Sequence, residues 1–314
     1  MPWRRTITPR AYARMTLAAV VLVSVIIVTG GAVRLSGSGL GCSDWPTCEQ
    51  GKLIQATNNH QAIEQINRLF TGLMMVVLII TVLGSLRRQP RRRDLTWLSL
   101  TLVAGVLGQA VVGGVVVLTH LHPLAVQQHF VLSVLIVAAA MVLHRRARED
   151  GERRRVVSAT VQRHVRAVVV GTALAIAAGT VVTGTNIHSG STSSGDPIRR
   201  FGFAITTVTR IHSVIVLATL GACLALALRL RARPTERTAL EDPISLFLLA
   251  GFTQAGIGYV QYALDTPALL VGVHLLGSVL VWVAAMHLLM ACRRADVMLD
   301  LAEPTAAEPT SSAV

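Results

Sequence analysis

Apolar stretches of about 20 residues, separated by short polar and often basic segments, make up most of this chain. A membrane-spanning helix needs roughly 20 apolar residues, because each residue rises about 1.5 Å and the hydrocarbon layer is about 30 Å thick. Alternating barrel-type strands are absent from these stretches, so we predict an all-α integral membrane protein with eight transmembrane helices. The predicted spans are 15–35, 66–86, 95–119, 126–144, 164–186, 205–228, 244–264 and 270–291. The first is longer than a typical signal-peptide core and has no clear cleavage site, so we expect it to be retained.

The sequence contains an internal repeat at a shift of 145 residues. His129 aligns with His274 within matching segments, and the same shift pairs Gln109 with Gln254, Gly113 with Gly258 and Asn67 with His212. Two repeats of four spans each have parallel topology, related by an axis along the membrane normal. We therefore predict two pseudo-symmetric four-helix bundles, at 1–144 and 164–291. A basic linker at 145–163 joins them, and a tail at 292–314 has the composition of a disordered segment.

Composition and charge fit this topology. The chain is 52% hydrophobic with a mean hydropathy of +0.58, and its formal net charge is +13. Of the 29 Lys and Arg residues, 23 fall in segments on one side of the predicted membrane. The positive-inside rule then predicts a multi-pass cell-membrane protein with both termini in the cytoplasm. The basic charge is therefore explained by membrane topology and does not indicate nucleic-acid binding. The other side has Arg34, Lys52, Arg68, Arg199, Arg200 and Arg210.

Histidines at the outer level of the spans are the main candidates for chemistry. Ionisable groups in a span are costly unless they face a bundle interior. His212 and His274, at matching depths on two helices, could clamp a haem iron as axial ligands. Interhelical hydrogen bonding is the alternative for both. By its equivalence to His274, His129 would be an iron ligand or a substrate contact in the first half.

Two other outer features are candidates. Glu64 lies one helical turn before Asn67, where a carboxylate could move protons, but an acid favoured by the helix dipole explains it equally well. Cys42 and Cys48 bracket a short outer loop containing Pro46. This compartment permits disulfides, so pairing is favoured over two free thiols, in either a structural or a redox role.

Taken together, these features resemble the haem A synthase family across nearly the whole eight-helix region. The resemblance is carried by Gly-Gly-Ala-Val-Arg-Leu-Ser-Gly-Ser-Gly-Leu-Gly-Cys at 30–42, by Trp45-Pro46 with Cys48, by Glu64 with Asn67-Arg68, by His129-Phe130, and by His212 and His274. It implies oxidation of the C8 methyl group of haem O to a formyl group, for cytochrome oxidase assembly. It also implies a haem b cofactor, with its iron between His212 and His274, and substrate haem in the first half beside the catalytic carboxylate of Glu64.

One departure from the family pattern concerns the substrate site. The family usually has histidine where this chain has Asn67. Asparagine is a poor iron ligand, so His129, alone or with a loop histidine, is expected to hold the substrate. Weak ligation suits a haem that must be released.

The expected partners are haem O, a haem O synthase that supplies it and membrane lipid. A homo-oligomer is compatible with this interpretation, and no nucleic acid is expected. The competing hypotheses are a di-histidine b-type cytochrome in quinone-linked electron transfer, a haem transporter and a purely structural assembly factor.

Overall fold

The computed structural model describes residues 6–189 and 199–297. It confirms the all-α membrane fold, because eight helices in the described part are long and apolar enough to cross a membrane. They are α1 (Pro9–Leu35), α2 (Asn59–Arg87), α3 (Arg93–Leu118), α4 (Pro123–Arg148), α5 (Ala159–Thr185), α6 (Ile205–Leu230), α7 (Pro234–Ala263) and α8 (Ala268–Ala291). A short 3-10 helix, η1 (Ile187–Ser189), follows α5.

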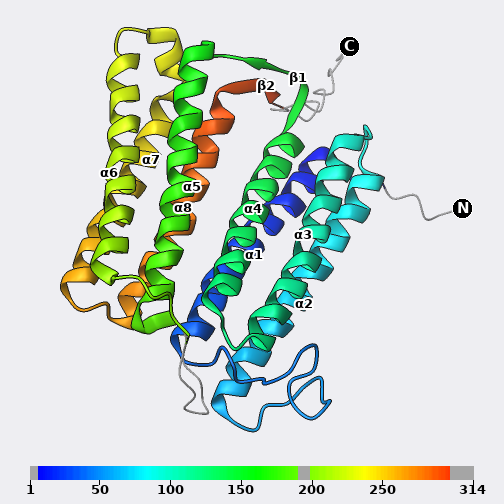
Figure 1. Ribbon diagram of the computed structural model, residues 1–314. Helices are drawn as coiled ribbons and strands as arrows, with labels where there is room; N and C mark the ends of the chain where they lie inside the picture. The colour runs from blue at the N-terminus through cyan, green and yellow to red at the C-terminus, as the bar shows by residue number, and fades with distance from the viewer. Residues whose placement is uncertain (1–5, 190–198, 298–314) are drawn as a thin grey trace, which may run out of the picture.

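The helices form two groups of four (Figure 1). Helices α1 to α4 pack on one another, as do α5 to α8, and the groups meet where α1 and α4 contact α8 and α4 contacts α5. Trp282 of α8 crosses this junction, and its indole N–H donates to the backbone oxygen of Val134 in α4 at 2.9 Å. Because α1 and α4 pack directly against helices of the other group, residues from both groups can line one internal space.

Several helices begin earlier than their apolar stretches. Helix α2 starts at Asn59, after Asn58, whose side chain accepts a hydrogen bond from the Gln61 N–H at 2.9 Å. Helix α1 begins at Pro9, after the capping hydroxyl of Thr8. A capping side chain satisfies N–H groups at the start of a helix, so polar turns can extend it beyond the hydrocarbon layer. The early start places Glu64 inside α2.

A two-stranded sheet closes one end of the molecule and was not among the predicted elements. Strands β1 (Glu149–Arg155) and β2 (Arg293–Val297) pair antiparallel, with Arg155 opposite Arg293. They use part of the predicted linker and the first residues of the predicted tail. Glu149, only 2% exposed, forms ion pairs with Arg145 and Arg153 there. The rest of the predicted tail, residues 298–314, lies outside the described residues. Residues 190–198, between η1 and α6, also lie outside them.

The disulfide loop lies at the opposite end of the bundle from this sheet (Figure 1). Helices α2, α4, α6 and α8 all begin at the loop end, so residues early in each of these helices share one level. Glu64, His129, His212 and His274 are all early residues of this kind. Sequence positions far apart are thereby brought to one layer.

Candidate functional site

One large cavity, of about 1660 Å³, occupies the interior toward the loop end. All eight helices contribute to its wall, which is mostly apolar. The wall includes all five of the predicted site residues that lie on helices: Glu64, Asn67, His129, His212 and His274. The structure therefore brings the candidates of both helix groups to one continuous space.

The two histidines related by the shift of 145 have matching surroundings. His129 lies on α4 against Gly113 of α3, where an added Cβ would be 3.3 Å from the ring Cε1 atom. His274 lies on α8 against Gly258 of α7, where the same distance would be 2.9 Å. A glycine on the neighbouring helix thus makes room for each imidazole.

The glutamines at the same shift repeat the pattern. The side-chain amide of Gln109 donates to the backbone oxygen of His129 at 2.9 Å, and that of Gln254 donates to the backbone oxygen of His274 at 2.7 Å. Each bond ties the helix carrying the histidine to its neighbour. Among the described residues, the buried Nδ1 atoms of both histidines have no hydrogen-bond partner.

His212 and Asn67, aligned by the repeat, make different contacts. The Nδ1 atom of His212 lies 3.0 Å from the backbone oxygen of Ala175. A carbonyl oxygen can only accept, so this nitrogen carries the proton and Nε2 keeps its lone pair for a metal. The Asn67 side-chain oxygen instead accepts from the Thr29 hydroxyl at 2.9 Å. At the positions aligned by the repeat, the second group therefore has two imidazoles on the cavity wall, where the first has one imidazole and an amide.

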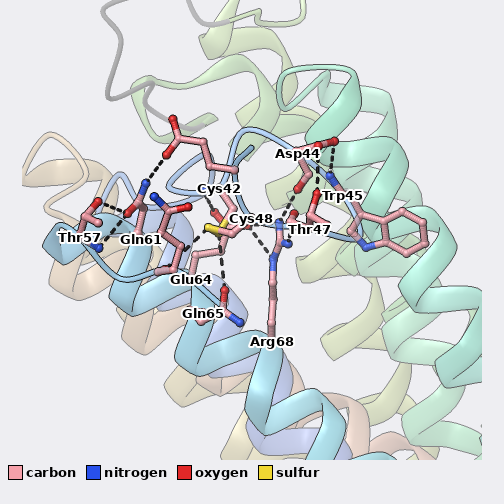
Figure 2. Close-up of a disulfide and its surroundings, with 12 residues drawn as sticks. Cys42, Asp44, Trp45, Thr47, Cys48, Thr57, Gln61, Glu64, Gln65 and Arg68 are labelled. Atoms are coloured by element: carbon pink, nitrogen blue, oxygen red, sulfur yellow. Dashed lines mark hydrogen bonds and ion pairs between the residues drawn. A yellow bond between two sulfur atoms is a disulfide. The ribbon is translucent and has the colours of Figure 1, made fainter. Parts of the chain in front are cut away.

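Cys42 and Cys48 form the predicted disulfide (Figure 2). Both sulfur-bearing residues are buried, and neither is among the cavity-lining residues. Trp45 and Pro46, inside the closed loop, do line the cavity. The loop therefore presents its aromatic residue, rather than its disulfide, to the interior.

Glu64 and Arg68 fasten this loop to α2 (Figure 2). One carboxylate oxygen of Glu64 accepts from the Cys42 backbone N–H at 2.9 Å, and the other pairs with the Arg68 guanidinium at 2.6 Å. Arg68 also donates to the backbone oxygens of Thr47 at 3.0 Å and Asp44 at 3.2 Å. Glu64 is only 6% exposed, so the carboxylate is satisfied by charged and polar donors in a largely enclosed position.

Three outer histidines have contacts of their own. His60 contacts the Ser38 hydroxyl at 3.0 Å, and His122 caps α4 through the Leu124 N–H at 3.3 Å. His188 lines the cavity, with its Nε2 atom 2.7 Å from the backbone oxygen of Thr266. Of the three, His188 alone is a lining residue.

One known protein family matches most of this chain. The model of the family described as cytochrome oxidase assembly protein matches residues 13–65 and 54–286. The chain belongs to this cytochrome oxidase assembly protein family. Its match covers the disulfide loop and every lining histidine.

Three curated relatives of this chain are named Heme A synthase. The protein from Bacillus pumilus is 31% identical over 133 residues, which is 41% of this chain and 43% of the relative. That from Listeria welshimeri is 25% identical over 174 residues, or 53% and 57%. That from Lysinibacillus sphaericus is 27% identical over 128 residues, or 40% and 42%. The chain spans about half the length of the curated relatives it matches.

Sequence reasoning missed several cavity residues. Trp45 was noted only as part of a motif, yet its ring packs against α3, where a Cβ at Gly114 would lie 2.7 Å from it. Arg34 is a motif residue and an outer charge in the sequence and Arg210 an outer charge, yet neither was predicted to be a site residue, and both line the cavity. A cation inside or beside an apolar stretch was the signal that could have identified them.

Proposed function

We propose that this chain is a haem A synthase that oxidises the C8 methyl group of haem O to a formyl group. The observation that carries the proposal is the unequal pair of ligand sets on one cavity: two histidines in the second helix group, and one histidine with an asparagine in the first. The family match and the name of the relatives, Heme A synthase, support the same activity.

The second group suits a resident haem b. His212 is oriented by Ala175 so that Nε2 can bind iron, and His274 has a buried Nδ1 atom without a partner in the described structure. Neutral imidazoles are common axial ligands of haem iron, and helix bundles hold such cofactors in their cores. When bound, the haem supplies the one-electron chemistry that amino-acid side chains lack. His212 and His274 would be its axial ligands.

The first group suits a substrate that must leave. His129 can offer one imidazole, whereas the Asn67 oxygen is engaged by Thr29 and is a weak ligand for iron. Trp45 and Pro46 line this part of the cavity from the disulfide loop. A haem held by one histidine under such a loop exchanges more easily than one clamped between two.

Glu64 is the proposed acid–base residue. In the proposed reaction a methyl group and one water become a formyl group, which releases four protons and four electrons. The electrons would leave one at a time through the haem of the second group to an external electron acceptor. The Glu64 carboxylate lines the cavity one helical turn from Asn67 on α2, where it could accept these protons. Its bonds to Arg68 and Cys42 fix its position and link it to the loop.

In the proposed orientation, the disulfide loop and the cavity face the outside of the cell membrane and both termini lie in the cytoplasm. The basic segments near the two-stranded sheet support this assignment through the positive-inside rule. Haem O and a haem O synthase that supplies it are the proposed partners, within the lipid bilayer.

Coexpression with a haem O source tests the activity. Haems extracted from the membranes are separated by chromatography and identified by mass. The proposal predicts the formyl product with the wild-type chain, and unchanged haem O with Glu64→Gln at equal expression. Unchanged haem O with the wild type would instead support a cytochrome, a transporter or a structural assembly factor.

A further inference from the structure

Two arginines line the cavity near the histidine pair of the second helix group. Arg34 lies on the last turn of α1, and Arg210 lies two residues before His212 on α6. Neither has a part in the acid–base or axial-ligand assignments above. Charged side chains within a membrane span are costly, and they commonly mark a binding site.

Packing between α1 and α8 sets the level of Arg34. A Cβ added at Gly31 would collide with the Leu275 side chain, and the Leu35 side chain lies 3.5 Å from where a Cβ on Gly272 would be. Gly31 and Leu35 flank Arg34, while Gly272 and Leu275 flank His274. Arg34 is therefore at the level of His274, although it belongs to the other helix group.

The face of α1 that carries Arg34 is turned toward the junction of the two groups. Ile27 lies seven residues earlier, two helical turns away on the same face. It borders a small internal space with Phe130 of α4, Ile176 of α5 and Val279 of α8. The Arg34 position thus faces the centre of the molecule rather than the lipid.

Arg210 lines the same cavity from α6, and its side chain is exposed at the loop end. It precedes His212 by two residues on α6, which begins at the loop end, so it lies slightly closer to that end than the imidazole. The third cavity arginine, Arg68, is already paired with Glu64 and bonded to the loop. Arg34 and Arg210 are thus the lining arginines that the packing of α1 on α8 and the sequence of α6 bring to the two histidines of the second helix group.

We propose that Arg34 and Arg210 bind the two propionate carboxylates of the haem held between His212 and His274. This inference rests on the proposed function, since it assumes that haem. A guanidinium group binds a carboxylate through two parallel hydrogen bonds, and such charge-assisted bonds are stronger than bonds between neutral groups. Arg34 and Arg210 would thereby hold the carboxylate edge of that haem, and the apolar residues of the cavity wall would contact the rest of it.

The test compares iron protoporphyrin IX with its dimethyl ester, which lacks the two negative charges. Both are titrated into haem-depleted full-length protein carrying His129→Ala, so that the first group does not contribute. Binding is followed by the absorption spectrum of iron with two histidine ligands. Arg34→Gln and Arg210→Gln are compared with Arg34→Lys, and with Arg237→Gln as a control at an exposed ion pair with Glu241.

We expect the diacid to bind about tenfold more tightly than the ester in the parent protein. Each glutamine variant should reduce that preference, Arg34→Lys should retain part of it, and Arg237→Gln should leave it unchanged. Removing a nearby cation should also shift the haem midpoint potential downward, because the ferric form carries the greater positive charge.

Equal affinity for diacid and ester in the His129→Ala parent protein would overturn the inference, and this comparison does not depend on the folding of any arginine variant. So would arginine variants that weaken both ligands to the same extent. If both compounds give the two-histidine spectrum and bind with the same affinity, the propionate assignment is overturned but the cofactor site stands. Absence of that spectrum with either compound would overturn the proposed cofactor site as well.

Discussion

Gly258 provides a sharp test of how the second helix group holds a haem ligand. In Gly258→Ala, the new methyl group would lie 2.9 Å from Cε1 of His274 and 3.5 Å from Nδ1. Ordinary contacts of this kind begin at 3.4 Å. The imidazole must therefore move away by roughly 0.5 Å or tilt, and overpacking of this kind costs about 1–3 kcal/mol. Haem affinity should fall by about 5- to 150-fold.

The matched control is Gly256→Ala on the same helix, where an added Cβ has nothing within 4 Å. Both substitutions raise helix propensity by about 1 kcal/mol, so that effect cancels in the comparison. The assay is the rate at which haem leaves the purified protein for an excess of apomyoglobin. Equal rates for the two variants would refute the claim that His274 is held as a ligand against Gly258.

Three further predictions concern the first helix group. Asn67→His should restore a two-histidine arrangement with His129, raise the haem content of the purified protein and slow product release; unchanged haem content in extracted pigment would contradict this. Arg68→Met should reduce formyl product by at least tenfold, because it removes the ion pair to the catalytic carboxylate and two bonds to the loop. Wild-type activity in the coexpression assay would count against that coupling. Cys42→Ser with Cys48→Ser should lower the free energy of unfolding by about 2 kcal/mol, given the small closed loop, and thermal unfolding with and without reductant measures it. A reductant-insensitive wild-type melting temperature would contradict a stabilising disulfide.

The membrane spans could be predicted from the apolar stretches of the sequence, and the equivalent site residues from the repeat at a shift of 145 residues. Long apolar stretches specify helices in hydrocarbon, so all eight were found with errors mainly at polar ends such as Asn59. The shift of 145 also held at the level of contacts. Gln109 with His129 and Gln254 with His274 make the same bond. The assignment of domain boundaries and axial ligands stays a prediction.

Contacts between distant segments could not be predicted in the same way. The packing of Trp45 on Gly114 joins the outer loop to α3, and the level of Arg34 depends on how α1 meets α8. Pairing of β1 with β2 joins charged segments with no strand-like alternation of apolar residues. Each of these contacts arises from the tertiary arrangement of the helices, which no local sequence pattern encodes.

The central claim is that the two halves are alike in fold and unequal in ligands. The most direct test is the reduced-minus-oxidised spectrum of His129→Ala and His274→Ala, combined with titration of haem O into each purified protein. We predict that His129→Ala loses haem O binding and keeps the spectrum of the second-half haem, whereas His274→Ala loses that spectrum. Loss of both properties together in His129→Ala would contradict the division between substrate and cofactor.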